Sequence, residues 1–178
     1  MQKYQVDRPH AVYVAQLSLQ LYDALIGFSG ARNNLWREYL ETAALLHDAG
    51  YFVNKKAHHK HSQYLIRHAR ETEYWEASTR DCIAELAYYH RKPLSTKKLR
   101  SLAQSPTRMA LSAILRIADG LDRCHCQKVV IHHIEISASA VDLSVTGLQR
   151  EPWEHLLRIK SQGFQQAFHR QFLIHNLR

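Results

Sequence analysis

The chain has 178 residues, of which 46% are hydrophobic and 22% are charged, the composition of an ordinary globular protein. This length fits one compact domain, alone or with a small appendage, and allows a buried core without disulfide bonds. Lys and Arg number 24 against 16 Asp and Glu, and the net charge of +8 favours anionic ligands such as phosphates. Because no apolar run approaches the roughly 20 residues that span a bilayer, we expect no membrane segment.

Apolar residues at intervals of three and four predict helices over the first two thirds of the chain. Asp7 is suited to cap the first helix, and Ser105-Pro106 is typical of another helix start. Gly50 marks a helix end, and a loop is expected over residues 51–57. The expected helices cover residues 9–27, 35–48, 58–69, 79–91, 95–103 and 106–123.

The pattern changes after Cys126. β-Branched residues within 129–136 and the alternation over 141–145 predict two strands joined by a turn. A helix over 152–169 and a short strand at 172–174 follow. We therefore expect a mainly α fold, in which a helical domain of residues 1–126 carries a small β-β-α-β appendage of residues 127–178.

The three cysteines are an odd number, and the start MQKYQVDRPH lacks the charged-then-apolar pattern of a signal peptide. Both features indicate free thiols in a cytoplasmic protein. Cys124-His125-Cys126 does not have the spacing of a zinc site, because only one residue separates the cysteines and no second pair completes four ligands.

The chain has 13 histidines, and their positions on the predicted helices matter more than their number. An inward-facing histidine is usually a core residue bonded to a carbonyl group, and each case alone allows that interpretation. Burying several polar groups costs roughly a few kcal/mol each unless they find partners, and a shared metal ion would satisfy several at once. Histidines that share a stripe with apolar residues are His10, His47, His61 and His90.

Two aspartates lie near these histidines. Asp48 ends a helix among small and apolar neighbours, where the helix dipole disfavours a negative charge. A nearby cation would remove that penalty, and an exposed acid at a frayed end is the alternative. Asp119 lies between Arg116 and Arg123 at helical spacing, which fits a solvated salt-bridge stripe as well as a metal ligand beside phosphate-binding arginines.

Five stretches of sequence carry a resemblance to a known family: DRPHAVYVAQLSLQLYDAL, AALLHDAGY, HHKHSQYLI, YYHRKP and LRIADGLDR. They resemble, in this order, the C-terminal helical domain of the exopolyphosphatase / guanosine pentaphosphate phosphohydrolase (Ppx/GppA) family. The order His, His-Asp, Asp also resembles the pattern of the His-Asp (HD) superfamily. The resemblance covers nearly the whole chain and implies an HD-type helical bundle.

The resemblance implies one metal ion held by His10, His47, Asp48 and Asp119. His61 and His90 stand where related enzymes with extra histidines hold a second ion, and His58 and His59 are weaker candidates because they lie near a helix start. Imidazoles and carboxylates together suit Mn, Fe, Co, Ni or Zn. We therefore expect one or two divalent metal ions as cofactors.

Such a centre would activate water for attack on phosphorus, with Asp48 holding or deprotonating the water. The arginines expected to neutralise phosphate charge are Arg91, Arg116 and Arg123. The expected function is a metal-dependent phosphohydrolase that acts on a phosphate ester or anhydride, such as a nucleotide or polyphosphate.

The alternative is a non-catalytic regulatory module that binds polyphosphate, nucleotide or nucleic acid through its basic surface. A purely structural metal site is disfavoured, because cysteine-rich coordination is missing. Full-length members of the family carry an actin-like phosphatase module, which this sequence lacks together with any glycine-rich phosphate loop. The family's principal activity therefore does not transfer directly, and nucleic acid and a second copy of the chain stay open as partners.

Overall fold

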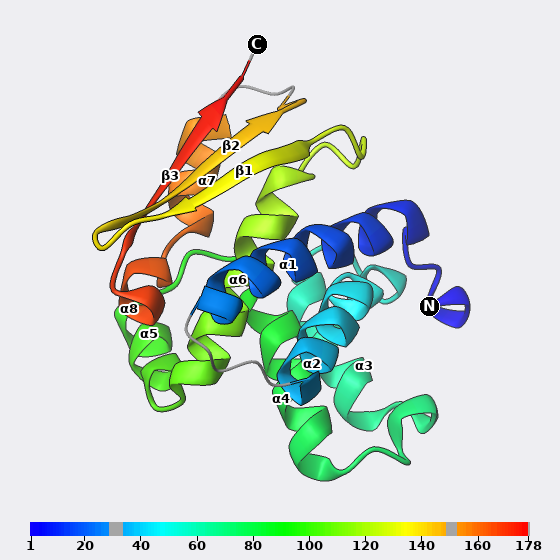
Figure 1. Ribbon diagram of the computed structural model, residues 1–178. Coiled ribbons are helices and arrows are strands. Elements are labelled where there is room, and N and C mark those ends of the chain that lie inside the picture. Colours follow the sequence, from blue (N-terminus) through cyan, green and yellow to red (C-terminus); the bar gives the residue numbers. More distant parts are fainter. Residues whose placement is uncertain (29–33, 149–152, 178) are drawn as a thin grey trace.

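A computed structural model describes residues 1–28, 34–148 and 153–177 and shows a helical body with a small sheet on one side (Figure 1). The mainly α fold with a C-terminal sheet is confirmed. The helices are α1 (Arg8–Phe28), α2 (Asn34–Leu46), α3 (His58–His68), α4 (Ala77–Tyr89), α5 (Thr96–Ala103), α6 (Pro106–Leu121), α7 (Trp153–Lys160) and α8 (Phe164–Phe168). The strands are β1 (Val130–Ile136), β2 (Ala140–Thr146) and β3 (Gln171–Asn176), and the 3-10 turns are η1 (Gln2–Tyr4), η2 (Ala49–Phe52) and η3 (Arg70–Thr72).

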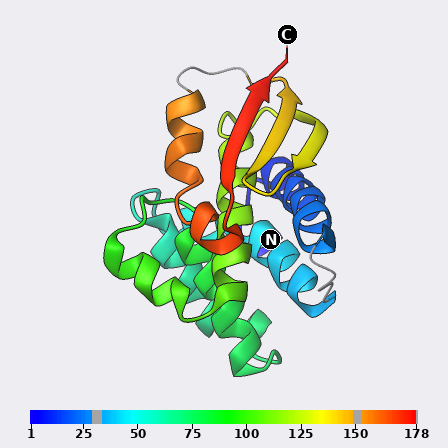
Figure 2. The ribbon, with the colours of Figure 1, turned by 60° about the vertical axis from the view of Figure 1, so that its left-hand side comes forward.

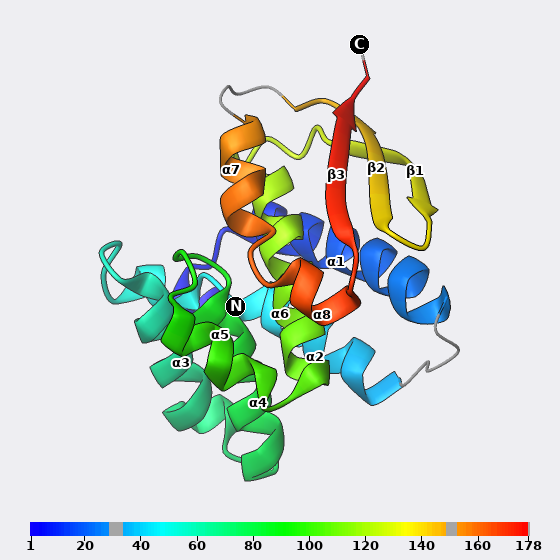
Figure 3. The same cartoon turned by 90° about the vertical axis from the view of Figure 1, so that its left-hand side faces the viewer.

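Helix α6 is the centre of the fold. Every residue from Met109 to Leu121 is buried, and the helix begins as predicted, with Ser105 accepting a hydrogen bond from the Arg108 backbone N–H. Figures 2 and 3 show α6 between the other long helices on one side and α7 with the sheet on the other.

None of the helices within the described ranges combines the length and the apolar character needed to span a bilayer.

The sheet has the order β1-β2-β3, with β1 antiparallel and β3 parallel to β2. The alternation predicted for β2 is confirmed, because Val141, Leu143 and Val145 are fully buried. These residues and Phe164 belong to the same buried cluster as the residues of α6. The C-terminal segment therefore shares its core with the helical body.

Two expected elements differ from the structure. The helix expected over 152–169 is interrupted by a turn at 161–163 between α7 and α8, in which Gly163, with φ 88°, precedes the first residue of α8. Pro152 lies outside the described residues. The helix expected to reach Asp48 ends at Leu46, and η2 occupies the start of the expected loop. Gly50 allows α3 to approach η2 here, because a Cβ atom at this position would lie 2.1 Å from the carbonyl oxygen of His58.

Candidate metal centre

Five residues predicted for the metal site lie together in the core, although they are far apart in the sequence. They come from the first turn of α1, the turn between α2 and η2, the residue after α4, and α6. All five side chains are buried, the most exposed retaining only 6% of its surface. They are His10, His47, Asp48, His90 and Asp119.

The carboxylate of Asp48 lies between two pairs of imidazoles. Its Oδ2 atom is 3.4 Å from Nε2 of His47 and 3.9 Å from Nε2 of His10. Its Oδ1 atom is 3.1 Å from Nε2 of His58 and 3.5 Å from Nε2 of His90. One carboxylate thus faces four imidazole nitrogens, an arrangement able to bridge two cations.

Asp119 joins the pair formed by His10 and His47, and these residues with Oδ2 of Asp48 make up the first group of candidate ligands. His58, His90 and Oδ1 of Asp48 make up the second group. The Oδ1 atom of Asp119 is 3.7 Å from Nε2 of His10 and 3.8 Å from Nε2 of His47. His10, His47 and Asp119 offer ligand atoms within 4.8 Å of one another, and so do His47, Asp48 and His90.

Hydrogen bonds at the other ring nitrogen fix the orientation of these imidazoles. Nδ1–H of His47 donates to the carbonyl of Ala44 at 2.6 Å, and Nδ1–H of His90 donates to that of Ala87 at 2.6 Å. His58 donates in the same way to a carbonyl three residues earlier, at 3.2 Å. Because a carbonyl oxygen only accepts, each Nε2 atom is left with a lone pair toward the centre.

Several of these polar atoms lack partners. Nε2 of His10 and Nε2 of His47 are buried and have no hydrogen-bond partner among the described residues. Nε2 of His58 and Nε2 of His90 face each other at 3.3 Å, so two lone pairs would oppose each other. A cation or a proton would relieve both situations, and the donor set fits a borderline divalent ion.

The structure does not bring His61 to this centre, and His58 takes the expected place. The stripe of α3 expected to face inward is wrong, because Tyr64 on that stripe is 64% exposed. α3 begins at His58 and turns another face to the core, which carries the buried residues His58, His59, Ser62 and Ile66.

Arg116 differs most from its expected role as a phosphate-binding residue. Its side chain is completely buried, and its guanidinium donates to the carbonyls of Tyr89, Lys92, Ile159 and Lys160 at 2.6–3.0 Å. All three guanidinium nitrogens are therefore occupied by backbone. Arg116 joins the segment after α4 to the end of α7, and it is not available to a substrate.

Arg123 lies at the entrance of the buried centre instead, and the charge of Arg91 acts on Tyr51 there. Arg123 lines a hollow of about 410 Å³ together with Asp48, Tyr51, Lys55 and residues of the N-terminal segment. Burial and the charge of Asp48 raise the pKa of Tyr51, whereas Arg91 and Arg123 act in the opposite direction. Both guanidinium groups therefore act on the entrance of the buried centre.

The sequence analysis missed two buried residues that contact the predicted ligands. Asp122 accepts a hydrogen bond from Nδ1–H of His10 at 2.8 Å. The ammonium group of Lys160 donates to Oδ2 of Asp119 and, at 2.9 Å, to the carbonyl of His90. Lys160 is 3% exposed and continues the apolar stripe of Leu157 and Phe164, which was the available signal in the sequence.

Burial and neighbouring charges shift the pKa values of the residues in the centre. Burial would raise the pKa of Asp119, but Lys160 and the histidines hold it well below its usual range. Burial would lower the pKa of His10, but Asp119, Asp122 and Asp48 raise it to about 9. The pKa of His90 is lowered well below its usual value by burial and by His47. Without a cation, a protonated His10 therefore balances part of the carboxylate charge.

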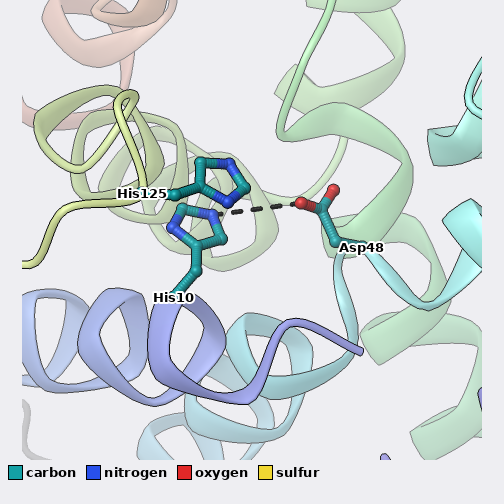
Figure 4. A group of neighbouring side chains, drawn as sticks. All are labelled: His10, Asp48 and His125. Carbon is teal, nitrogen blue, oxygen red and sulfur yellow. Dashed lines mark ion pairs between the residues drawn. The ribbon is translucent and has the colours of Figure 1, made fainter. Parts of the chain in front are cut away.

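At the entrance, the turn after α6 lies against His10. Figure 4 shows the ring of His125 lying over His10, with Asp48 facing the pair. The two rings are stacked with centroids 3.6 Å apart, and Nδ1–H of His125 donates to Asp7 at 2.9 Å.

The expectation of three free thiols is wrong, because a disulfide joins Cys124 to Cys126 across His125 and only Cys82 is free among the described cysteines.

Comparison with known proteins identifies the family. The family described as Ppx/GppA phosphatase, domain III, matches residues 1–161. A guanosine-5'-triphosphate,3'-diphosphate pyrophosphatase of Pseudoalteromonas atlantica is 28% identical over 117 residues, which make up 66% of this chain and 23% of that protein. The matched segment thus spans less than a quarter of this relative. Because the family match covers most of its length, the chain belongs to the Ppx/GppA phosphatase domain III family.

Proposed function

We propose that this chain is a metal-dependent phosphohydrolase of the HD type, acting on a phosphate ester or anhydride such as a nucleotide or polyphosphate. One observation carries the proposal: the Asp48 carboxylate lies between four imidazole Nε2 atoms at 3.1–3.9 Å. Three of these imidazoles are fixed by backbone carbonyls and the fourth by Asp122, so that the Nε2 lone pairs face inward.

Two divalent cations fit the donor set. His10, His47, Asp119 and Oδ2 of Asp48 would hold one ion. His58, His90 and Oδ1 of Asp48 would hold the other, with Asp48 as the bridge. Mixed imidazole and carboxylate ligands suit Mn, Fe, Co, Ni or Zn.

A divalent cation held there would supply an acidified water and neutralise phosphate charge. The protein's own residues would exclude water and bind the phosphate. The buried side chains around the centre exclude bulk water. The hollow at Asp48 admits a phosphate group past the cations Lys55 and Arg123. Lys160 keeps Asp119 ionised and holds its Oδ2 atom, so that Oδ1 faces the histidines.

The second candidate is a regulatory module that binds phosphate-rich ligands without hydrolysing them. The net charge of +8 favours this alternative, and so does the fact that the matched segment makes up 23% of a much longer pyrophosphatase. A purely anion-binding surface, however, needs no buried set of imidazoles without partners.

The deciding experiment pairs metal analysis with activity. We expect purified protein, after loading with Mn²⁺ or Zn²⁺, to hold two ions per chain and to release phosphate from at least one member of a panel of nucleotides and polyphosphate. Asp48→Asn should abolish both metal loading and phosphate release, because Asp48 belongs to both groups of ligands. Asp81→Asn is the matched control, since Asp81 is exposed and pairs with Arg67. Protein that loads metal but hydrolyses nothing would support the regulatory alternative, and protein that holds no metal would refute the proposal.

A further inference from the structure

The turn after α6, residues 122–127, contacts His10 in more than one way. Oδ2 of Asp122 accepts a hydrogen bond from Nδ1–H of His10 at 2.8 Å. The ring of His125 stacks on His10 with an interplanar angle of 8° (Figure 4). Gln127 holds Asp122 in turn, through its backbone N–H at 2.8 Å and its side-chain amide at 3.1 Å. The conformation of this turn therefore determines how His10 is held.

The backbone of the turn is unfavourable by itself. His125 has φ 53° and Gln127 has φ 51°, the left-handed region that residues with a Cβ atom avoid. Two such residues lie within three positions, and the Cys124–Cys126 disulfide spans the first of them. Closing the ring thus favours a backbone conformation that an open chain would leave.

The disulfide is also accessible. Cys124 and Cys126 are half-buried, and His125 between them is exposed, whereas Cys82 is 1% exposed. A small thiol therefore reaches the disulfide more easily than it reaches Cys82. Disulfides of this kind in reducing compartments are usually transient and regulatory rather than structural.

We propose that Cys124–Cys126 is a thiol-modifiable site, and that its redox state controls how tightly the centre holds a cation at His10. The inference rests on the proposed metal centre. A low-molecular-weight thiolate attacks one sulfur, forms a mixed disulfide and releases the other cysteine as a thiolate, which takes up a proton. A second thiol resolves the mixed disulfide, so two electrons pass to the cysteines and the small thiol leaves as its own disulfide.

Opening the disulfide weakens the support of His10. The two left-handed residues relax, His125 leaves its stack, and Asp122 loses its fixed position. Loss of such outer contacts lowers metal affinity by about 10- to 100-fold. The second group should be unaffected, because His58 and His90 are fixed by the carbonyls of Lys55 and Ala87.

The first measurement counts thiols. Native protein after mild oxidation with oxidised glutathione should show no reactive thiol toward a chromogenic disulfide reagent, and denatured protein should show one, from Cys82. Native protein reduced with a phosphine should show two. Three thiols in denatured protein after the oxidation step would overturn the proposal.

The second measurement titrates metal-free protein with Mn²⁺, which has little affinity for thiolates, and follows free Mn²⁺ by electron paramagnetic resonance. The reductant is removed before the titration. Oxidised protein should bind two equivalents, and reduction should weaken one of them at least tenfold. The double variant Cys124→Ser/Cys126→Ser should bind like the reduced protein in either state, and Cys82→Ser should behave like the wild type.

The outcomes separate the two proposals. Equal Mn²⁺ binding by oxidised and reduced protein would refute the redox inference alone, and no binding in either state would refute the metal centre as well. Tight binding in the double variant would assign the effect to the thiolates rather than to the turn. Should the double variant fail to fold, His125→Ala keeps the disulfide and tests the same step, with weakening of one Mn²⁺ equivalent expected and unchanged binding contradicting it.

Discussion

The ammonium group of Lys160 lies buried against Oδ2 of Asp119, while Oδ1 of the same carboxylate faces Nε2 of His10 and Nε2 of His47. The lysine comes from α7, 41 residues after the aspartate in the sequence. A segment that looks like an appendage thus supplies the only lysine buried among the described residues. The C-terminal segment is therefore part of the site.

Replacing Lys160 with Met should destabilise the metal-free protein by about 3–5 kcal/mol, because Asp119 would be left buried without its cation. Saturating Mn²⁺ should recover much of this loss, because the metal replaces the missing positive charge. Urea unfolding with and without Mn²⁺ measures both values, and Lys56→Met at an exposed position is the control. An equal loss with and without Mn²⁺ would mean that Lys160 acts through packing alone.

Replacing Arg116 with Met should destabilise the protein by at least about 3 kcal/mol, because four backbone carbonyls would lose their donor. Arg116→Lys should not restore stability, since one ammonium group cannot bridge carbonyls on two separate segments. Urea unfolding gives the stabilities, and the KM for the hydrolysed substrate gives the comparison. A raised KM with unchanged stability would restore the phosphate-binding role expected from the sequence.

Replacing His58 with Ala should reduce the bound metal from two ions to one, because His58 contacts only the second group of ligands. His61→Ala is the matched control on the same helix and should leave two ions bound. Elemental analysis after gel filtration checks both variants. If His61→Ala removed an ion and His58→Ala did not, the assignment of the two histidines would be reversed.

The stability of metal-free protein should depend on pH through His10. Its pKa is raised from 6.5 to about 9, so the folded state binds the proton more tightly than the unfolded chain does. The resulting stability is fully present below pH 6.5 and is lost as the pH rises through 9. Mn²⁺ competes with this proton, so its affinity should rise over the same interval.

Unfolding in urea between pH 6 and 9.5, in the presence of a chelator, measures this dependence. His10→Asn should flatten the profile, because the titrating group is gone. A wild-type profile that is already flat over this range would contradict the raised pKa of His10.

Much of the fold followed from local patterns. The stripes of apolar residues predicted the long helices within a few positions, Ser105 capped α6 as expected, and the alternation of β2 was visible in the sequence. Hydrophobic periodicity is a property of neighbouring residues, which a single sequence displays. The interruption at Gly163 was missed, because both halves of the expected helix kept a helical pattern.

The candidate site was likewise predicted in part from local sequence patterns and in part missed. His10, His47 and His90 were identified because each shares a helix face with apolar residues, and the structure buries all three. His61 was preferred to His58 because His58 lies at the start of the helix, where exposure to solvent was expected. The buried face of α3 instead runs through His58, Ser62 and Ile66, and only the packing of α3 decides which face that is.

The sequence by itself determined which helix faces are apolar, which polar residues interrupt them, and to which family the chain is similar. Only the tertiary structure decided that Asp48 lies between four imidazoles, that the guanidinium group of Arg116 donates its hydrogen bonds to backbone carbonyls, and that the ammonium group of Lys160 contacts Asp119. The reason is physical: periodicity is set by neighbours along one helix, whereas these contacts join residues up to 44 positions apart and depend on how α6 packs against the other elements.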